Sequence, residues 1–124
     1  WQRPGGMYDA ILGADSAERL NPFRRVMDRG FMLGFGSDSM PMDPLYGLSG
    51  AVNHRNPHQS LSASEALLAY TLRSAGISGK DELSRPLAPG RSADLVALSR
   101  DPFLGFEGVR VAATFRRGRA VYRA

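Results

Sequence analysis

The sequence predicts an α/β protein in which helices alternate with a buried strand, followed by a small β unit. A helix pattern leads through Gly30 into the run FMLGF at 31–35, which is apolar on both faces, as a strand covered by helices would be. The segment SLSASEALLAYTLRSA at 60–75 has the pattern of an amphipathic helix. Residues 109–122 contain two apolar runs around an Arg-Gly pair, which is typical of a β-hairpin.

The first thirty residues are expected to form short helices. Their weak pattern favours a helix at 7–12 or at 16–20. A further helix is expected to begin with Asn21 as its cap and Pro22 at its first position. Gly30 is its expected C-terminal stop.

Asp38 is the strongest candidate for a functional residue. It follows the expected strand in the turn Gly36-Ser37-Asp38, and α/β folds place their sites at the C-terminal ends of strands. A carboxylate held there could bind a metal ion, or take a proton from a metal-bound water. The alternative is an Asx-turn, in which Asp38 bonds its own backbone near Ser39 or Met40. The residues alone leave both interpretations open.

The middle of the chain combines a long loop with a well-marked helix. Residues 40–60 are expected to be irregular, with one helical turn at 45–52, and a loop of this length is usually functional or disordered. The next helix begins with a capping box, because Ser62 can bond the amide of Glu65 and Glu65 can bond the amide of Ser62. Gly76 is its expected end. Its apolar residues are expected to share one face: Leu68, Leu72 and Ala75, with Leu67 beside them.

β patterns begin after Lys80. Residues 87–90 predict a turn and 93–98 predict a strand. Two further strands are expected at 109–115 and 120–122, joined by the Arg-Gly turn. The chain is therefore expected to have two parts: an α/β part at 1–78 and a β part at 79–124.

Composition excludes several function classes. The chain has 124 residues and no cysteine, which excludes disulfides, thiolate metal sites and a cysteine nucleophile. It contains no apolar run long enough to predict a membrane span, and its first residues lack the layout of a signal peptide. We therefore expect a cytoplasmic protein.

The basic charge gathers near the end of the sequence. The net charge is +4, and the arginines cluster late: Arg110, Arg116, Arg117, Arg119 and Arg123. They could form a patch for nucleic acid or an acidic partner. No nucleic-acid-binding motif accompanies them, so we expect a solvated face of the hairpin instead.

Two other polar signals are weaker. His54 and His58 have the spacing of two metal ligands on one helix, but Pro57 between them argues for loop residues. Arg55 could clamp an anionic group of a substrate. A lone arginine is nevertheless most often only a surface charge.

Five sequence motifs follow one another in an order that suggests a protein family. They are DRGFMLGFGSDSMP, a loop ending in VNHR, SLSASEALLAYTLRSA, LAPGRSADLVALSRDP and TFRRGRAVY. Together they resemble the C-terminal end of the amidohydrolase superfamily, in particular the family 3 type of metal-dependent hydrolase. The resemblance covers residues 21–124. It implies the last β/α units of a (β/α)8 TIM-type barrel at 1–78, and strands of a small composite β-sandwich at 79–124.

The resemblance also implies an activity. A metal-activated water would hydrolyse a C–N bond of a small amide-type substrate, with a divalent metal, expected to be zinc. By position, Asp38 resembles the aspartate that serves as metal ligand and proton shuttle. The family's His-x-His motif, carboxylated lysine and later histidine ligands are absent from this sequence, and a full barrel needs about twice its length. We therefore expect the chain alone to bind no catalytic metal and to be an inactive C-terminal portion of a larger hydrolase.

Two further expectations concern partners. A last barrel strand without its barrel exposes apolar faces and strand edges, so we expect self-association, which light scattering would detect. The alternative function is a non-catalytic remnant or binding module that uses the arginine-rich hairpin.

Overall fold

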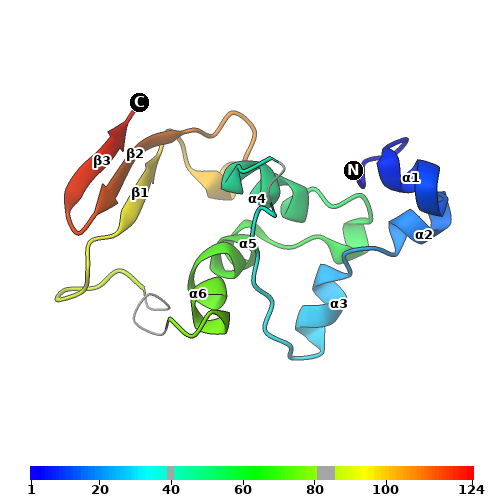
Figure 1. The fold of residues 1–124 in the computed structure, drawn as a ribbon, viewed down its shortest axis with the longest axis horizontal. Helices are drawn as coiled ribbons and strands as arrows, with labels where there is room; N and C mark the ends of the chain where they lie inside the picture. Colours follow the sequence, from blue (N-terminus) through cyan, green and yellow to red (C-terminus); the bar gives the residue numbers. More distant parts are fainter. Residues whose placement is uncertain (39–40, 81–85) are drawn as a thin grey trace.

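The computed structural model describes residues 1–38, 41–80 and 86–124. Helices occupy most of the chain up to residue 77, and a three-stranded antiparallel sheet lies near the C-terminus. Figure 1 shows the sheet at the opposite end of the molecule from α1 and α2, with α4 and α5 between them. The described residues therefore mix helices with strands, and the only sheet that they form is antiparallel.

The N-terminal region contains both of the short helices expected as alternatives. α1 (Met7–Leu12) and α2 (Ala14–Glu18) contact each other across Gly13. Gly13 has a φ of 78°, a left-handed conformation that glycine adopts without steric cost.

α3 (Phe23–Asp28) begins one residue later than expected. The prediction that Asn21 caps this helix is wrong, since Pro22 occupies the cap position. Asn21 has a φ of 51°, and its side-chain amide donates instead to Gln2 Oε1 at 2.6 Å. The expected stop at Gly30 is confirmed: its φ is 78°, and its N–H donates to the carbonyl of Met27 at 2.8 Å.

The apolar run at 31–35 does not form a strand in the described structure. A strand requires a neighbouring chain to pair its N–H and C=O groups, and the described residues offer it none. The run is instead an extended segment that bonds a helix, because the N–H of Phe35 donates to the carbonyl of Ala69 at 3.0 Å. Phe31 and Met32 remain exposed.

The loop at 40–60 contains more helix than expected. α4 (Pro44–Val52) spans nine residues and includes the expected turn. Asp43 caps it, accepting a hydrogen bond from the N–H of Leu45 at 2.9 Å. A short 3₁₀ turn, η1 (Pro57–Gln59), follows.

The capped helix is confirmed and is longer than expected. α5 (Ala63–Leu68), a π-helical turn η2 (Ala69–Arg73) and α6 (Ser74–Ile77) follow one another directly. Both bonds of the capping box form. The helix continues past Gly76. Of the predicted apolar face, Leu68 is exposed, Leu72 and Ala75 are half-buried, and Leu67 packs against the core. The fully buried residues of this helix are Ala66 and Ala69.

The C-terminal strands form as expected. The sheet has the order β1 (Leu95–Leu98), β2 (Val111–Arg116), β3 (Arg119–Arg123). The turn between β2 and β3 has positive φ at both central residues, Arg117 and Gly118, which suits the twist of a tight hairpin. All five residues of β3 are exposed. A 3₁₀ turn, η3 (Pro102–Leu104), lies between β1 and β2.

A small core joins the helical region to the connection between β1 and β2. Phe106, from the connection between β1 and β2, is buried with residues of the helical region: Leu48, Ala51, Leu61 and Ala66. The chain nevertheless exposes 8829 Å² of surface. A compact monomer of this mass would expose about 6,500 Å². None of the described helices is long and apolar enough to cross a membrane.

Candidate functional site

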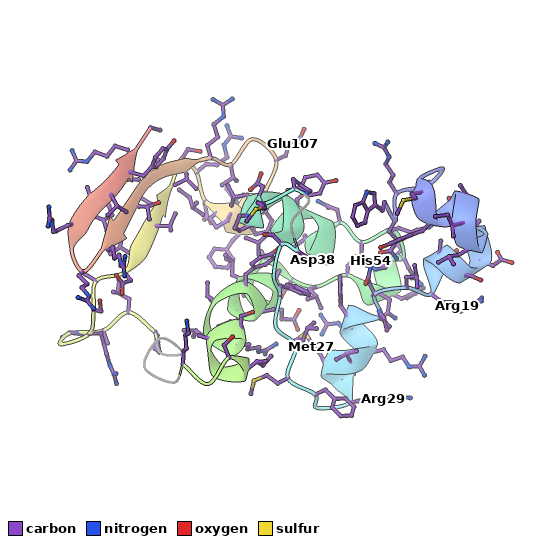
Figure 2. The ribbon with its side chains drawn as sticks, in the orientation of Figure 1. Arg19, Met27, Arg29, Asp38, His54 and Glu107 are labelled. Carbon is purple, nitrogen blue, oxygen red and sulfur yellow. The ribbon has the colours of Figure 1, made fainter. Side chains whose placement is uncertain are left out.

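Asp38 lies in an exposed turn at the end of the extended segment. Its φ of 42° is in the left-handed region, which aspartate tolerates better than most residues. Figure 2 shows Asp38 near the centre of the molecule, at the end of the segment that leads away from α3. The alternative Asx-turn would end on Ser39 or Met40, which lie outside the described residues. Both interpretations of Asp38 therefore remain predictions.

A metal site is not assembled within the part of the chain that the structure describes. No group of three or more histidine, cysteine, aspartate or glutamate side chains is placed there to hold an ion. A zinc site needs three or four protein ligands. Asp38 alone therefore does not fit a complete metal centre.

The two histidines occupy separate elements. His54 is only 7% exposed, and its ring packs edge-on against Phe23 with 5.5 Å between the ring centroids. Its Nδ1 lies 2.9 Å from the backbone nitrogen of Asn56, and its Nε2 lies 3.4 Å from Nε2 of Gln2. His58 is exposed on η1. His54 therefore lies in a loop, as predicted, whereas the loop prediction for His58 is wrong because His58 lies in a 3₁₀ turn; the two do not share one helix.

A cavity of about 540 Å³ opens beside the extended segment. Its aromatic lining includes Phe23, Phe35 and Tyr70, whose rings pack in sequence with centroid distances of 5.0 and 5.5 Å. Gly36 also lines it, so the cavity reaches the backbone two residues before Asp38. The sequence did not predict this cavity because its walls come from five separate stretches of chain, and no local pattern marks such an assembly.

Gly47 of α4 leaves space for the side chain of Tyr70 to pack against that helix. A Cβ atom at Gly47 would lie 2.0 Å from the Tyr70 hydroxyl oxygen and 2.9 Å from its ring carbon Cζ. Glycine therefore lets the tyrosine of the π-helical turn lie directly against α4. This contact fixes the distance between the two elements that enclose the cavity.

Arg55 lines the same cavity, but its charge already has a partner. Its side chain is 12% exposed and forms an ion pair with Asp9 of α1, and its Nη1 donates to the carbonyl of Gln2 at 3.3 Å. The hydrogen bond from Arg55 is the main reason that the pKa of Asp9 lies below its ordinary value. A substrate anion would have to displace Asp9. The observed contact ties the N-terminal helices to the rest of the molecule.

A second ion pair joins α3 to α5. Arg24 makes two bonds to Glu65, from Nη1 to Oε1 at 2.8 Å and from Nη2 to Oε2 at 2.5 Å. These bonds are the largest of several causes that lower the pKa of Glu65 to about 2. The pair connects the helix before the extended segment to the helix on which that segment lies.

Comparison with known proteins identifies the family. The model of the amidohydrolase family matches residues 3–122, which is almost the whole chain. The chain belongs to the amidohydrolase family. The resemblance drawn from its five sequence motifs is thereby confirmed.

This amidohydrolase chain also matches a curated relative, the Bacillus subtilis (strain 168) protein named "Putative amidohydrolase YtcJ". The two are 33% identical over an alignment of 104 positions, which covers 74% of this chain and 20% of the relative. The amidohydrolase chain thus spans about a fifth of that relative's length. Among solved structures, none matches it.

Proposed function

We propose that this chain is the C-terminal portion of a metal-dependent amidohydrolase that hydrolyses C–N bonds of small amide-type molecules. The observation that carries the proposal is the family match over residues 3–122. Amidohydrolases are generally metal-dependent. In this proposal residues 1–78 supply the last units of a TIM-type barrel, and residues 79–124 supply strands of a composite β-sandwich.

Asp38 is the proposed acid–base residue of the larger hydrolase. Its carboxylate accepts a proton from the water that attacks the substrate carbonyl, and it returns a proton to the nitrogen as the C–N bond breaks. Asp38 is exposed and lies two residues after Gly36, which lines the cavity, so solvent can reach its carboxylate. Arg55 is the weaker candidate for binding the substrate, since Asp9 already occupies it.

The metal of the larger hydrolase, which we propose to be zinc, cannot be held by the described residues alone. In this proposal, further ligands come from other parts of the larger hydrolase. The isolated chain is therefore proposed to be inactive. The surface area supports packing against further protein, because the chain exposes about 2,300 Å² more than a compact monomer of its mass, an area comparable to a large protein interface. Self-association of the isolated chain stays a prediction.

The test is Asp38→Asn in the full-length hydrolase, assayed against a panel of small amides. Asparagine has the shape of aspartate but cannot accept the proton, so kcat should fall by at least about a hundredfold while the melting temperature stays the same. Asp15→Asn is the matched control, because Asp15 is an exposed aspartate of α2. Unchanged turnover in Asp38→Asn would remove the assignment. Tight stoichiometric zinc binding by the isolated chain would contradict its proposed inactivity.

The arginine-rich hairpin supports a second candidate function, that of a binding module. Arg116 and Arg117 are exposed, as are Arg119 and Arg123 of β3. Binding to an acidic partner or nucleic acid at low salt, weakening as salt is added, would favour this candidate. No binding at low salt would leave it without support.

A further inference from the structure

The π-helical turn η2 makes a carbonyl available to the extended segment. The carbonyl oxygen of Ala69 accepts hydrogen bonds from the N–H of Phe35 at 3.0 Å and from the Ser74 hydroxyl at 2.8 Å. A carbonyl oxygen has two lone pairs, so it can accept both bonds. π turns within helices are rare and often occur at functional sites, which makes this one informative.

Ser74, five positions after Ala69 in the same continuous helix, connects the same two backbone stretches. Its hydroxyl lies 2.7 Å from the carbonyl oxygen of Phe35, and it is shared with the carbonyl of Ala69. Both backbone polar groups of Phe35 are therefore engaged by the helix. Removing the hydroxyl would leave the Phe35 carbonyl without this partner.

Gly34 also indicates that the backbone of the extended segment lies close against the helix. A Cβ atom at Gly34 would lie 2.9 Å from Ser74 Oγ, 3.2 Å from Ser74 Cα and 2.8 Å from Ile77 Cδ1. Only a glycine lets the backbone lie so close to the helix. The side chain of Phe35 is held as well, between the rings of Phe23 and Tyr70.

This anchor limits where Asp38 can lie. Asp38 is three positions after Phe35, and an extended chain spans at most about 3.6 Å per residue, or about 11 Å in all. The position of the Phe35 backbone thus limits the positions that the Asp38 carboxylate can reach.

We propose that Ser74 is a positioning residue for Asp38: by holding the backbone of Phe35 against the π turn, its hydroxyl sets the place of the Asp38 carboxylate. The inference rests on the proposed function, in which Asp38 transfers the proton. Ser74 itself does not touch the substrate. Its effect is expected on the chemical step, because small displacements of a reacting group are costly in rate.

The test compares Ser74→Ala with Ser78→Ala in the full-length hydrolase. Ser78 is the matched control, since its hydroxyl also donates to a backbone carbonyl, but to that of Ser74 at 2.8 Å, within its own helical stretch. Ser74→Ala should lower kcat roughly ten- to a hundredfold at unchanged KM. Ser78→Ala should match the parent.

A second pair of variants separates positioning from folding. Threonine and valine have the same shape, so Ser74→Thr and Ser74→Val differ only in the hydroxyl. The threonine form should retain kcat and the valine form should lose it, at similar melting temperatures. Equal kcat values in these two forms would overturn the inference, even if Ser74→Ala does not fold.

Asp38→Asn, measured in the same series, distinguishes this inference from the proposed function. If Asp38→Asn is inactive while Ser74→Ala and Ser74→Val turn over like the parent, the positioning role is wrong and the proposed function stands. If Asp38→Asn is fully active, the proposed function fails and the positioning role fails with it.

Discussion

Replacing Glu65 by glutamine should destabilise the fold at neutral pH by an amount that shrinks in acid. Glutamine can still complete the capping box, so the substitution mainly removes the charge that Arg24 binds. The pKa of Glu65 is lowered from 4.5 to about 2, chiefly by the hydrogen bonds from Arg24. That difference corresponds to about 3 kcal/mol at most. The side chains of Arg24 and Glu65 are 31% and 26% exposed, so solvent screening reduces the expected loss to about 1–2 kcal/mol.

The sign of the pH dependence follows from the lowered pKa. The folded state favours ionised Glu65, so the stabilisation is complete above pH 4.5 and disappears as the pH falls towards 2. Urea unfolding of the parent and Glu65→Gln should therefore differ at pH 7 and converge near pH 2. Glu107→Gln, at an exposed glutamate, is the control and should change stability little at any pH. A difference between parent and Glu65→Gln that does not vary between pH 7 and 2 would refute the electrostatic reasoning.

Two further substitutions test the contacts around the cavity. Gly47→Ala should lower the free energy of unfolding by about 1–3 kcal/mol, because its Cβ would overlap Tyr70. Gly50→Ala in the same helix meets no atom within 4 Å and should raise the free energy of unfolding by up to about 1 kcal/mol. Thermal melts of the two variants distinguish packing from helix propensity. Asp9→Asn should loosen α1 and α2, seen as faster amide hydrogen exchange there, because the ion pair with Arg55 is lost. The pKa of Asp9 is lowered, so this effect should be full above pH 3.8 and fade below it; equal exchange rates at pH 7 in Asp9→Asn and the parent would contradict the role given to Arg55.

Elements fixed by neighbouring residues could be predicted from the sequence. The capping box at Ser62 and Glu65 and the turn at Arg117 and Gly118 depend on residues at most three positions apart, and both form. The prediction of a strand at 31–35 is wrong because a strand depends on a neighbouring strand to pair with. Here the segment bonds to a helix instead.

The candidate site was less predictable than the fold. Asp38 could be selected because its type and position follow a local pattern. The contacts of Arg24 with Glu65 and of Arg55 with Asp9 join residues 41 and 46 positions apart, and no local pattern pairs them. The cavity and the contact between Ser74 and Phe35 depend on the same kind of long-range packing.

The charged edge of the sheet has a consequence for the chain during its synthesis. β3 is an edge strand, and its two ends carry Arg119 and Arg123 on either side of Val121. If two copies paired along this edge around Val121, Arg119 of each would face Arg123 of the other, and like charges placed opposite each other destabilise a strand pair. The arginines thus act as gatekeepers against edge-to-edge stacking of identical chains. This like-charge repulsion disfavours pairing of newly made chains along β3.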